Sequence, residues 1–134
     1  EAPDVFSAIA SVTGTMSGFD WNNCNPSKPI PALRIHGVDD DVVPIDGSMG
    51  DWGGWGGAPH ADEVVSFWAN LNGTTTIDSV FLSPSTNAFY HRNGQNGHEV
   101  WYYRIDNWGH GWPGSSSNTG TIASEVISGF FSKF

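Results

Sequence analysis

The predicted fold is decided first by residues 99–114, which read EVWYYRIDNWGHGWPG. The first part, Glu99–Ile105, is rich in aromatic and β-branched side chains, and this composition predicts a strand. The second part sets His110 between glycines and tryptophans and ends in Pro113-Gly114, a composition typical of a loop. Because open α/β sheets place reactive side chains at the carboxyl ends of their strands, His110 is a candidate functional residue.

A second junction of strand and loop lies about 70 residues upstream of His110. Ala32–His36 predicts a strand, and the loop that follows carries three consecutive aspartates, Asp39 to Asp41. An acid after one strand and a histidine after a later strand give the Asp…His order of a hydrolase triad. The third member, a serine within Gly-x-Ser-x-Gly, should precede both, and that motif is absent from the sequence.

Strands and helices alternate along the rest of the chain. The apolar run 6–14 predicts a buried parallel strand. Residues 88–92 and 99–105 flank a turn suited to a hairpin, whereas 77–82 fits either a strand or an extended loop. Apolar side chains at helical spacing predict a helix over 61–71. They also predict a final helix with one apolar stripe, formed by Ile122, Val126, Ile127 and Phe130. This alternation predicts an α/β fold with a mostly parallel sheet and flanking helices.

The composition indicates a single domain, residues 1–134, of a secreted protein. Of the 134 residues, 38% are hydrophobic and 13% are aromatic, which is enough to fill one core. The net charge of −9, with five Lys and Arg residues, argues against nucleic acid as a partner. No run of about 18 apolar residues is present, so no membrane insertion is predicted. Few charges, 17 glycines and seven tryptophans are typical of an extracellular protein with long ordered loops.

Five motifs extend this pattern over nearly the whole chain: APDVFSAIA (2–10), HG-x-x-D-x-VVP (36–44), WA-x-x-NG (68–73), EV (99–100) and GH-x-WPG (109–114). In this order they resemble the C-terminal half of extracellular polyhydroxybutyrate-depolymerase and feruloyl-esterase-like α/β-hydrolases. The resemblance implies the C-terminal part of an α/β-hydrolase fold, a partial domain that is incomplete without an N-terminal segment. It also implies that this segment, or a second chain, carries the serine nucleophile and supplies the oxyanion hole.

The chain departs from this family after Asn72-Gly73, where Thr74 stands in a place that the family often gives to a cysteine. Cys24 is the single cysteine, so this sequence holds no second cysteine at the position that the resemblance would pair with it. It is expected either to be a buried small side chain or to pair with a cysteine outside this chain.

The resemblance assigns the triad acid to Asp40 and the general base to His110. An aspartate at a strand end can accept the imidazole N–H, fix the ring's tautomer and stabilise the imidazolium. Asp39 and Asp41 remain alternatives, as does a purely structural turn. A calcium loop is not predicted, because the pattern Asp-x-Asp-x-Asp-Gly is absent. Neither a metal site nor a cofactor is predicted, and the remaining histidines are expected to be structural or exposed: His36, His60, His91 and His98.

Four tryptophans lie on the loops expected at the mouth of this site. Their flat apolar faces suit a hydrophobic acyl chain, an aromatic acid or a polymer surface. Trp52 and Trp55 are set among glycines and are predicted to contact substrate rather than to fill the core. Trp108 and Trp112 either contact substrate or cover the core around the triad.

These observations predict a serine-type carboxylic ester hydrolase to which this chain contributes Asp40 and His110. Polyhydroxyalkanoate, feruloyl and simple acyl esters all remain open as substrates. The alternative is a catalytically inactive, hydrolase-derived module that binds polymer or carbohydrate through its aromatic loops. Intact acid and histidine motifs favour the enzyme, because a binding module has no chemical need to keep both.

Overall fold

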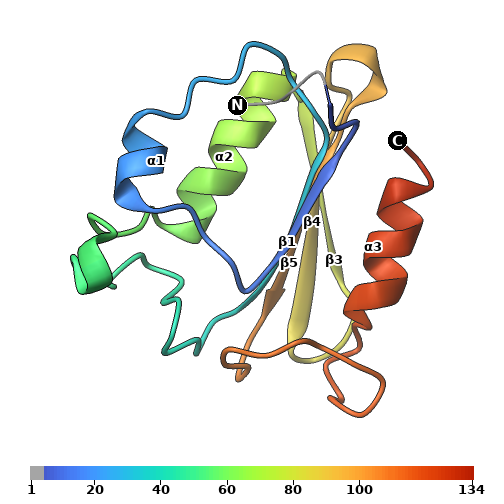
Figure 1. Cartoon of the computed structure of the whole chain (residues 1–134). Coiled ribbons are helices and arrows are strands. Elements are labelled where there is room, and N and C mark those ends of the chain that lie inside the picture. The colour runs from blue at the N-terminus through green and yellow to red at the C-terminus, as the bar shows by residue number, and fades with distance from the viewer. Residues whose placement is uncertain (1–4) are drawn as a thin grey trace.

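The computed structural model describes residues 5–134, without the side chain of Trp52. Within this range the chain forms five strands, three α-helices and two short 3-10 helices (Figure 1). The strands are β1 (Ile9–Val12), β2 (Ala32–Gly37), β3 (Thr76–Phe81), β4 (Thr86–Arg92) and β5 (Val100–Ile105). The helices are α1 (Gly18–Asn22), α2 (Ala61–Asn72) and α3 (Ala123–Phe131), with η1 at Trp52–Gly54 and η2 at Gln95–Gly97.

The strands form one sheet in the order β1-β2-β5-β4-β3. β1, β2 and β5 run parallel to one another, with Ile9 opposite Ala32 and Ala32 opposite Val100. β4 is antiparallel to both of its neighbours, β5 and β3. The sheet is therefore mixed, with its parallel strands on one side and an antiparallel hairpin on the other.

The prediction of a mostly parallel sheet, as in the C-terminal part of an α/β-hydrolase fold, is wrong. The described chain is a small compact domain in which two of the four neighbouring strand pairs are antiparallel. The connections explain this result, because residues 82–85 join β3 to β4 and residues 93–99 join β4 to β5. Parallel neighbours need a crossover of about a dozen residues or more, so links this short impose antiparallel pairing.

Helices cover both faces of the sheet. Figure 1 shows α1 and α2 on one face and α3 on the other. The alternate residues of β2 serve two separate clusters, with Leu33 and Ile35 packing toward α3 and Ala32 packing toward α2. All six residues of β2 are buried, as expected for a central strand that is covered on both faces.

The sequence around α2 accounts for its limits. The His60 ring accepts a hydrogen bond from the backbone N–H of Asp62 (3.1 Å) before the helix begins. Gly73 ends the helix in the left-handed conformation, with φ of 65°. The predicted helix over 61–71 is thus confirmed. The predicted C-terminal helix is also present, although it begins one residue after Ile122. In the described part of the chain, no helix is long and apolar enough to cross a bilayer.

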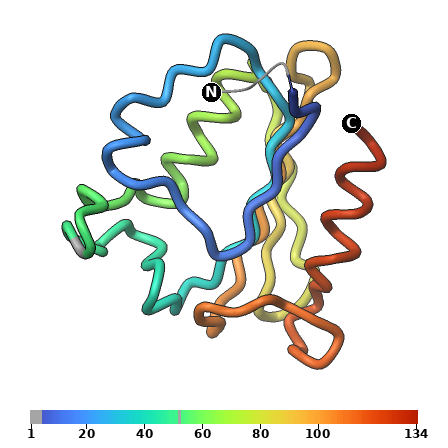
Figure 2. Tube along the Cα trace, viewed as in Figure 1, coloured from blue at the N-terminus to red at the C-terminus, as the bar shows by residue number. Residues whose placement is uncertain are grey.

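Two long loops leave the sheet at the same end. β2 and β5 are parallel neighbours with Gly37 opposite Ile105, so residues 38–60 and residues 106–122 start side by side. Figure 2 shows both loops at the lower end of the molecule, one in cyan to green and the other in orange. This end of the sheet holds the candidate site.

Candidate active site

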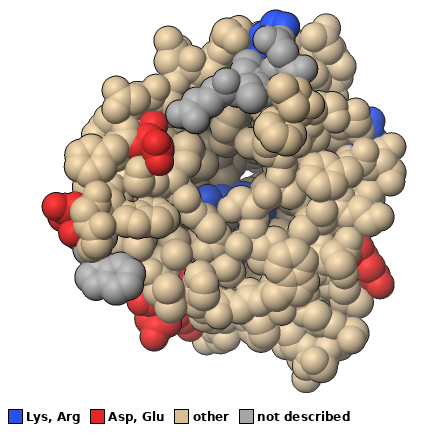
Figure 3. Space-filling view, in the orientation of Figure 1, with Lys and Arg blue, Asp and Glu red and all other residues tan. Residues whose placement is uncertain are grey.

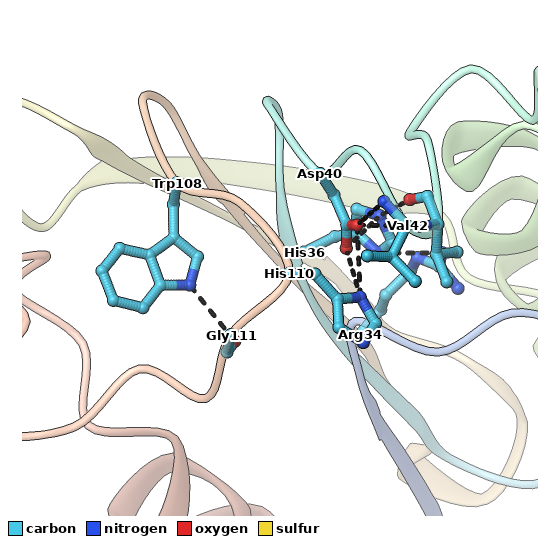
Figure 4. Close-up of polar contacts among 8 residues, drawn as sticks. Arg34, His36, Asp40, Val42, Trp108, His110 and Gly111 are labelled. Atoms are coloured by element: carbon cyan, nitrogen blue, oxygen red, sulfur yellow. Dashed lines mark hydrogen bonds and ion pairs between the residues drawn. The ribbon is translucent and has the colours of Figure 1, made fainter.

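Asp40 lies on the loop that follows β2 and is buried, with 4% of its surface exposed. Its Oδ1 accepts hydrogen bonds from the backbone N–H groups of Val42 (3.0 Å) and Val43 (2.8 Å). This is the local turn that aspartate side chains commonly form with the backbone two and three residues ahead. The turn holds the carboxylate in one orientation (Figure 4).

His110 lies on the loop that follows β5, and its ring reaches the carboxylate of Asp40. His110 Nδ1 is 3.2 Å from Asp40 Oδ1 and 3.1 Å from Asp40 Oδ2. The imidazole side chain is 39% exposed, whereas the carboxylate side chain is fully buried. The structure therefore joins two side chains that are 70 residues apart in the sequence, as their positions after neighbouring strands predict.

The contact determines which ring nitrogen of His110 can act as a base. A carboxylate accepts hydrogen bonds, so the proton of the neutral ring is assigned to Nδ1 and the lone pair to Nε2. Within residues 5–134, the hydrogen bonds of the His110 ring are those to Asp40. Nε2 is thus left to accept a proton from another group.

His36 and Arg34 support Asp40 from the buried side. His36 is 0% exposed, and its Nε2 lies 2.9 Å from the Val43 carbonyl oxygen and 3.7 Å from Asp40 Oδ2. Arg34 Nη2 donates to His36 Nδ1 (3.1 Å), so the ring proton belongs on Nε2, which donates to Val43. Burial and the positive charge of Arg34 lower the pKa of His36. The neutral ring therefore anchors the turn that presents Asp40.

Sequence reasoning did not assign these two residues to the site. Their signal is the alternation Arg34-x-His36 within a buried strand, which places both side chains on the α2 face of the sheet. A charged residue inside an apolar strand is rarely buried without a partner, and this spacing could have marked them as a pair.

Gly37 lets the two site loops approach each other closely. A Cβ atom at this position would lie 2.1 Å from the Trp108 carbonyl oxygen and 2.7 Å from the Gly109 carbonyl oxygen. A backbone hydrogen bond joins the two loops at the same place, because the Asp39 N–H donates to the Trp108 carbonyl oxygen (3.1 Å). The backbone itself therefore holds the aspartate loop against the histidine loop.

The other two aspartates of the run are not part of the contact with His110 in the described chain. Asp39 and Asp41 are exposed, and neither carboxylate hydrogen-bonds to His110 in the described chain. Asp40 is thus the aspartate that the geometry favours among the alternatives. Residues 5–134 contain no group of three or more His, Cys, Asp and Glu residues able to hold a metal ion.

The candidate tryptophans divide into packed and exposed residues. Trp108 is half-buried against the α3-side core, and its Nε1–H donates to the Gly111 carbonyl oxygen (3.2 Å), so it holds the histidine loop in shape. Trp112 is 59% exposed two residues after His110. Trp55 is also exposed, and its carbonyl oxygen accepts a hydrogen bond from Gly18 at the start of α1 (2.9 Å). The side chain of Trp52 lies outside the described residues.

The chain matches no known protein family, and no curated protein matches it. The function is therefore inferred from the geometry of Asp40 and His110 together with the sequence motifs.

Proposed function

We propose that this chain supplies the acid and the base of a serine-type carboxylic ester hydrolase. One observation carries the proposal: the Nδ1 atom of a part-exposed histidine lies 3.1 Å from a buried carboxylate that two backbone N–H groups hold in place. This is the orientation that a histidine needs to act as a general base and then as a general acid. The chain's motifs, which resemble those of polyhydroxybutyrate depolymerases and feruloyl esterases, point to the same chemistry.

In this proposal His110 Nε2 takes the proton of the serine hydroxyl while the serine oxygen attacks the ester carbonyl carbon. The tetrahedral intermediate collapses by breaking the bond to the leaving alcohol oxygen, which receives the proton from His110. Water then attacks the acyl-enzyme with His110 as base, and the acid product and the free serine are released. Asp40 accepts the Nδ1–H of His110 and stabilises the imidazolium in both steps.

The environment of Asp40 supports this role. His36 is the nearest titratable group on the buried side, and its lowered pKa keeps it uncharged at neutral pH. The carboxylate therefore has no second histidine cation beside it. Arg34 adds an attractive positive charge from the buried side, and the carboxylate stabilises the charge that forms on the His110 ring in contact with it.

The serine would come from an N-terminal segment or from a second chain, and the region beside β1 offers a place for it. β1 is an edge strand whose carboxyl end lies at the same end of the sheet as Asp40. An apolar cavity of about 70 Å³ lies beside it, lined by Ile9, Trp68 and Arg34 among others. Figure 3 shows a hollow on the same side of the molecule, with Lys or Arg atoms at its floor. Within the described chain, Arg34 Nε is buried without a hydrogen-bond partner.

A strand added parallel to β1 would end in the same row as β2 and β5. Open α/β sheets place their reactive side chains at the carboxyl ends of the strands. A serine placed directly after such a strand would therefore approach His110 from the side on which the Asp40 loop lies. We infer that the missing nucleophile is supplied at this edge.

The substrate would be an ester with an apolar or aromatic acyl group. The exposed Trp112 lies within two residues of the base and offers a flat apolar face to such a group. Polyhydroxyalkanoates, feruloyl esters and simple acyl esters are all carboxylic esters, and each is a candidate substrate for a secreted protein. The exposed Trp55 and Trp112 also suit the rival function, a polymer- or carbohydrate-binding module without catalysis.

The test is hydrolysis of p-nitrophenyl butyrate by the chain alone and by the chain together with a segment that carries Gly-x-Ser-x-Gly. The chain alone should be close to background, because loss of the nucleophile costs about 10⁶-fold in turnover in subtilisin. Addition of the segment should restore turnover. Strong hydrolysis by the chain alone that a serine-directed phosphonate blocks would contradict an external nucleophile. Polymer binding without hydrolysis by the assembled protein would favour the binding module.

A further inference from the structure

The outer edge of the sheet opposite β1 is exposed and apolar. β3 forms this edge, and all six of its residues are exposed. Phe81 is 78% exposed and Ile77 is 63% exposed, although both are large apolar side chains. Edge strands are commonly protected by charges, prolines or bulges. Asp78 is the one charged residue of β3, and it already forms an ion pair with Arg92 of β4 at 2.8 Å.

The apolar residues of β3 share a face with a hollow in the surface. Ile77 pairs with His91 and Ser79 pairs with Phe89, so these side chains lie on the face that α2 covers in part. A cavity of about 320 Å³ opens there between the sheet and α2, and its wall includes Ile77, Phe89 and Val65. An apolar side chain arriving beside Ile77 would lie at the rim of this cavity.

We propose that two copies of this chain associate through β3, as antiparallel strands centred on Ser79. In an antiparallel pair, residues directly opposite each other point to the same face of the sheet. Two identical strands related by a two-fold axis can keep this arrangement only if the axis passes between the two copies of one residue. The pair is then centred on that residue and not between two residues. Centring on Ser79 places Ile77 opposite the partner copy's Phe81, and by symmetry the same contact forms twice.

The neighbouring registers are less favourable. Centring on Asp78 would place two carboxylates directly opposite each other, which destabilises a strand pair. Centring on Val80 would place each Phe81 opposite a serine and would leave Ile77 without an apolar neighbour across the interface. The Ser79 register alone among these three pairs apolar with apolar on the face that bears the cavity. Of these three registers, the one centred on Ser79 is thus the register in which β3 fits a second β3 best.

This association should be weak and sensitive to salt. One strand pair and four apolar side chains bury less surface than the total of about 1,200 Å² that is the lower limit for stable specific complexes. Each copy also carries a net charge of −9, so electrostatic repulsion opposes the dimer and added salt should strengthen it. We expect a dimer that forms as the protein concentration rises.

The test is disulfide cross-linking in a Cys24→Ala background. Ser79→Cys should form a covalent dimer under mild oxidation, because opposed antiparallel residues have Cα atoms about 4.5–5.5 Å apart, within the range of a disulfide. Val80→Cys is the matched control, since it lies on the same strand but on the other face. In the Ser79 register the two copies of residue 80 are about 7–8 Å apart, too far for an unstrained disulfide.

A second measurement follows the dimer without a new cysteine. Phe81→Lys should weaken self-association at least tenfold in sedimentation velocity, whereas Phe6→Lys, at a comparably exposed position ahead of β1, should leave it unchanged. The proposal is overturned if Ser79→Cys does not cross-link, if Val80→Cys cross-links as readily, or if Phe6→Lys rather than Phe81→Lys dissociates the dimer.

Discussion

Replacing Gly37 with alanine tests whether backbone contact between the two site loops positions His110. The new Cβ would lie 2.1 Å from the Trp108 carbonyl oxygen, whereas real Cβ contacts are essentially never shorter than 3.0 Å. The two backbones would have to separate by at least 0.9 Å, the difference between these two distances. Both oxygen atoms near the new methyl belong to the backbone, so no side-chain rotation can relieve the overlap.

This separation would reach the candidate site directly. The Asp39 N–H to Trp108 bond of 3.1 Å and the His110–Asp40 contact of 3.1 Å span the same gap, and both would stretch to about 4 Å, beyond hydrogen-bonding distance. Overpacking costs about 1–3 kcal/mol, and the two lost hydrogen bonds cost about 1 kcal/mol each. The unfolded alanine chain has less conformational freedom than the unfolded glycine chain, which offsets about 0.4–1 kcal/mol of this cost. We therefore expect a net destabilisation of about 2–5 kcal/mol.

Urea unfolding followed by tryptophan fluorescence measures the stability, and ¹⁵N NMR of the His110 ring measures the share of the Nδ1–H tautomer. Gly109→Ala is the matched control, because its Cβ would meet its nearest atom at 3.6 Å, an ordinary contact. That variant should stay within about 0.5 kcal/mol of the wild type. A Gly37→Ala protein with unchanged stability and tautomer, or an equal loss of stability in Gly109→Ala, would show that backbone contact at Gly37 does not position His110.

Three further predictions concern the same region. Asp40→Asn should lower kcat of the proposed esterase on p-nitrophenyl butyrate by about 10⁴-fold, the loss known for the equivalent change in a serine protease triad, while the exposed Asp41→Asn should leave it unchanged. Because burial lowers the pKa of His36, the unfolded chain takes up a proton below about pH 6.5 that the folded chain does not. The urea midpoint should therefore fall between pH 7.5 and pH 5, and His36→Gln should reduce this fall even though His91 and His98 contribute in the same direction. Trp108→Ala should cost about 2 kcal/mol, roughly half the loss for a fully buried tryptophan, whereas Trp112→Ala should leave the urea midpoint unchanged and lower activity on bulky esters only.

The sequence predicted those helices and strands in which the spacing of apolar residues matches the face that the structure buries. α2 has apolar residues at helical spacing and a glycine directly after its last turn, and both features survive in the structure. β3 was ambiguous for a physical reason, since all of its residues are exposed and it lacks the alternation that marks a half-buried strand. α1 was missed because five residues give too short a pattern, although Ser17 caps it by accepting a hydrogen bond from the Asp20 N–H (3.0 Å).

The pairing of Arg34 with His36 has a local signal, but their role at the site has none. The two side chains are two residues apart on one strand, and Arg34 Nη2 donates to His36 Nδ1. The other partner of His36 is the Val43 carbonyl oxygen, which belongs to the loop after β2. Local sequence therefore shows that two polar residues lie together in a strand, but it does not show that they anchor the turn of Asp40, because that contact depends on the path of the loop.

The contact between Asp40 and His110 was predicted from the sequence even though the predicted sheet was wrong, and the topology explains how both can hold. The contact requires only that β2 and β5 be parallel neighbours, so that the loops after Gly37 and Ile105 leave from adjacent positions. The antiparallel hairpin of β3 and β4 attaches to the other side of β5 and does not change the end from which residue 106 departs. An Asp…His order after two strands therefore predicts only that those two strands are parallel neighbours. It carries no information on the direction of the strands beyond them, and for that reason the motifs predicted the Asp40–His110 contact but not the direction of β4.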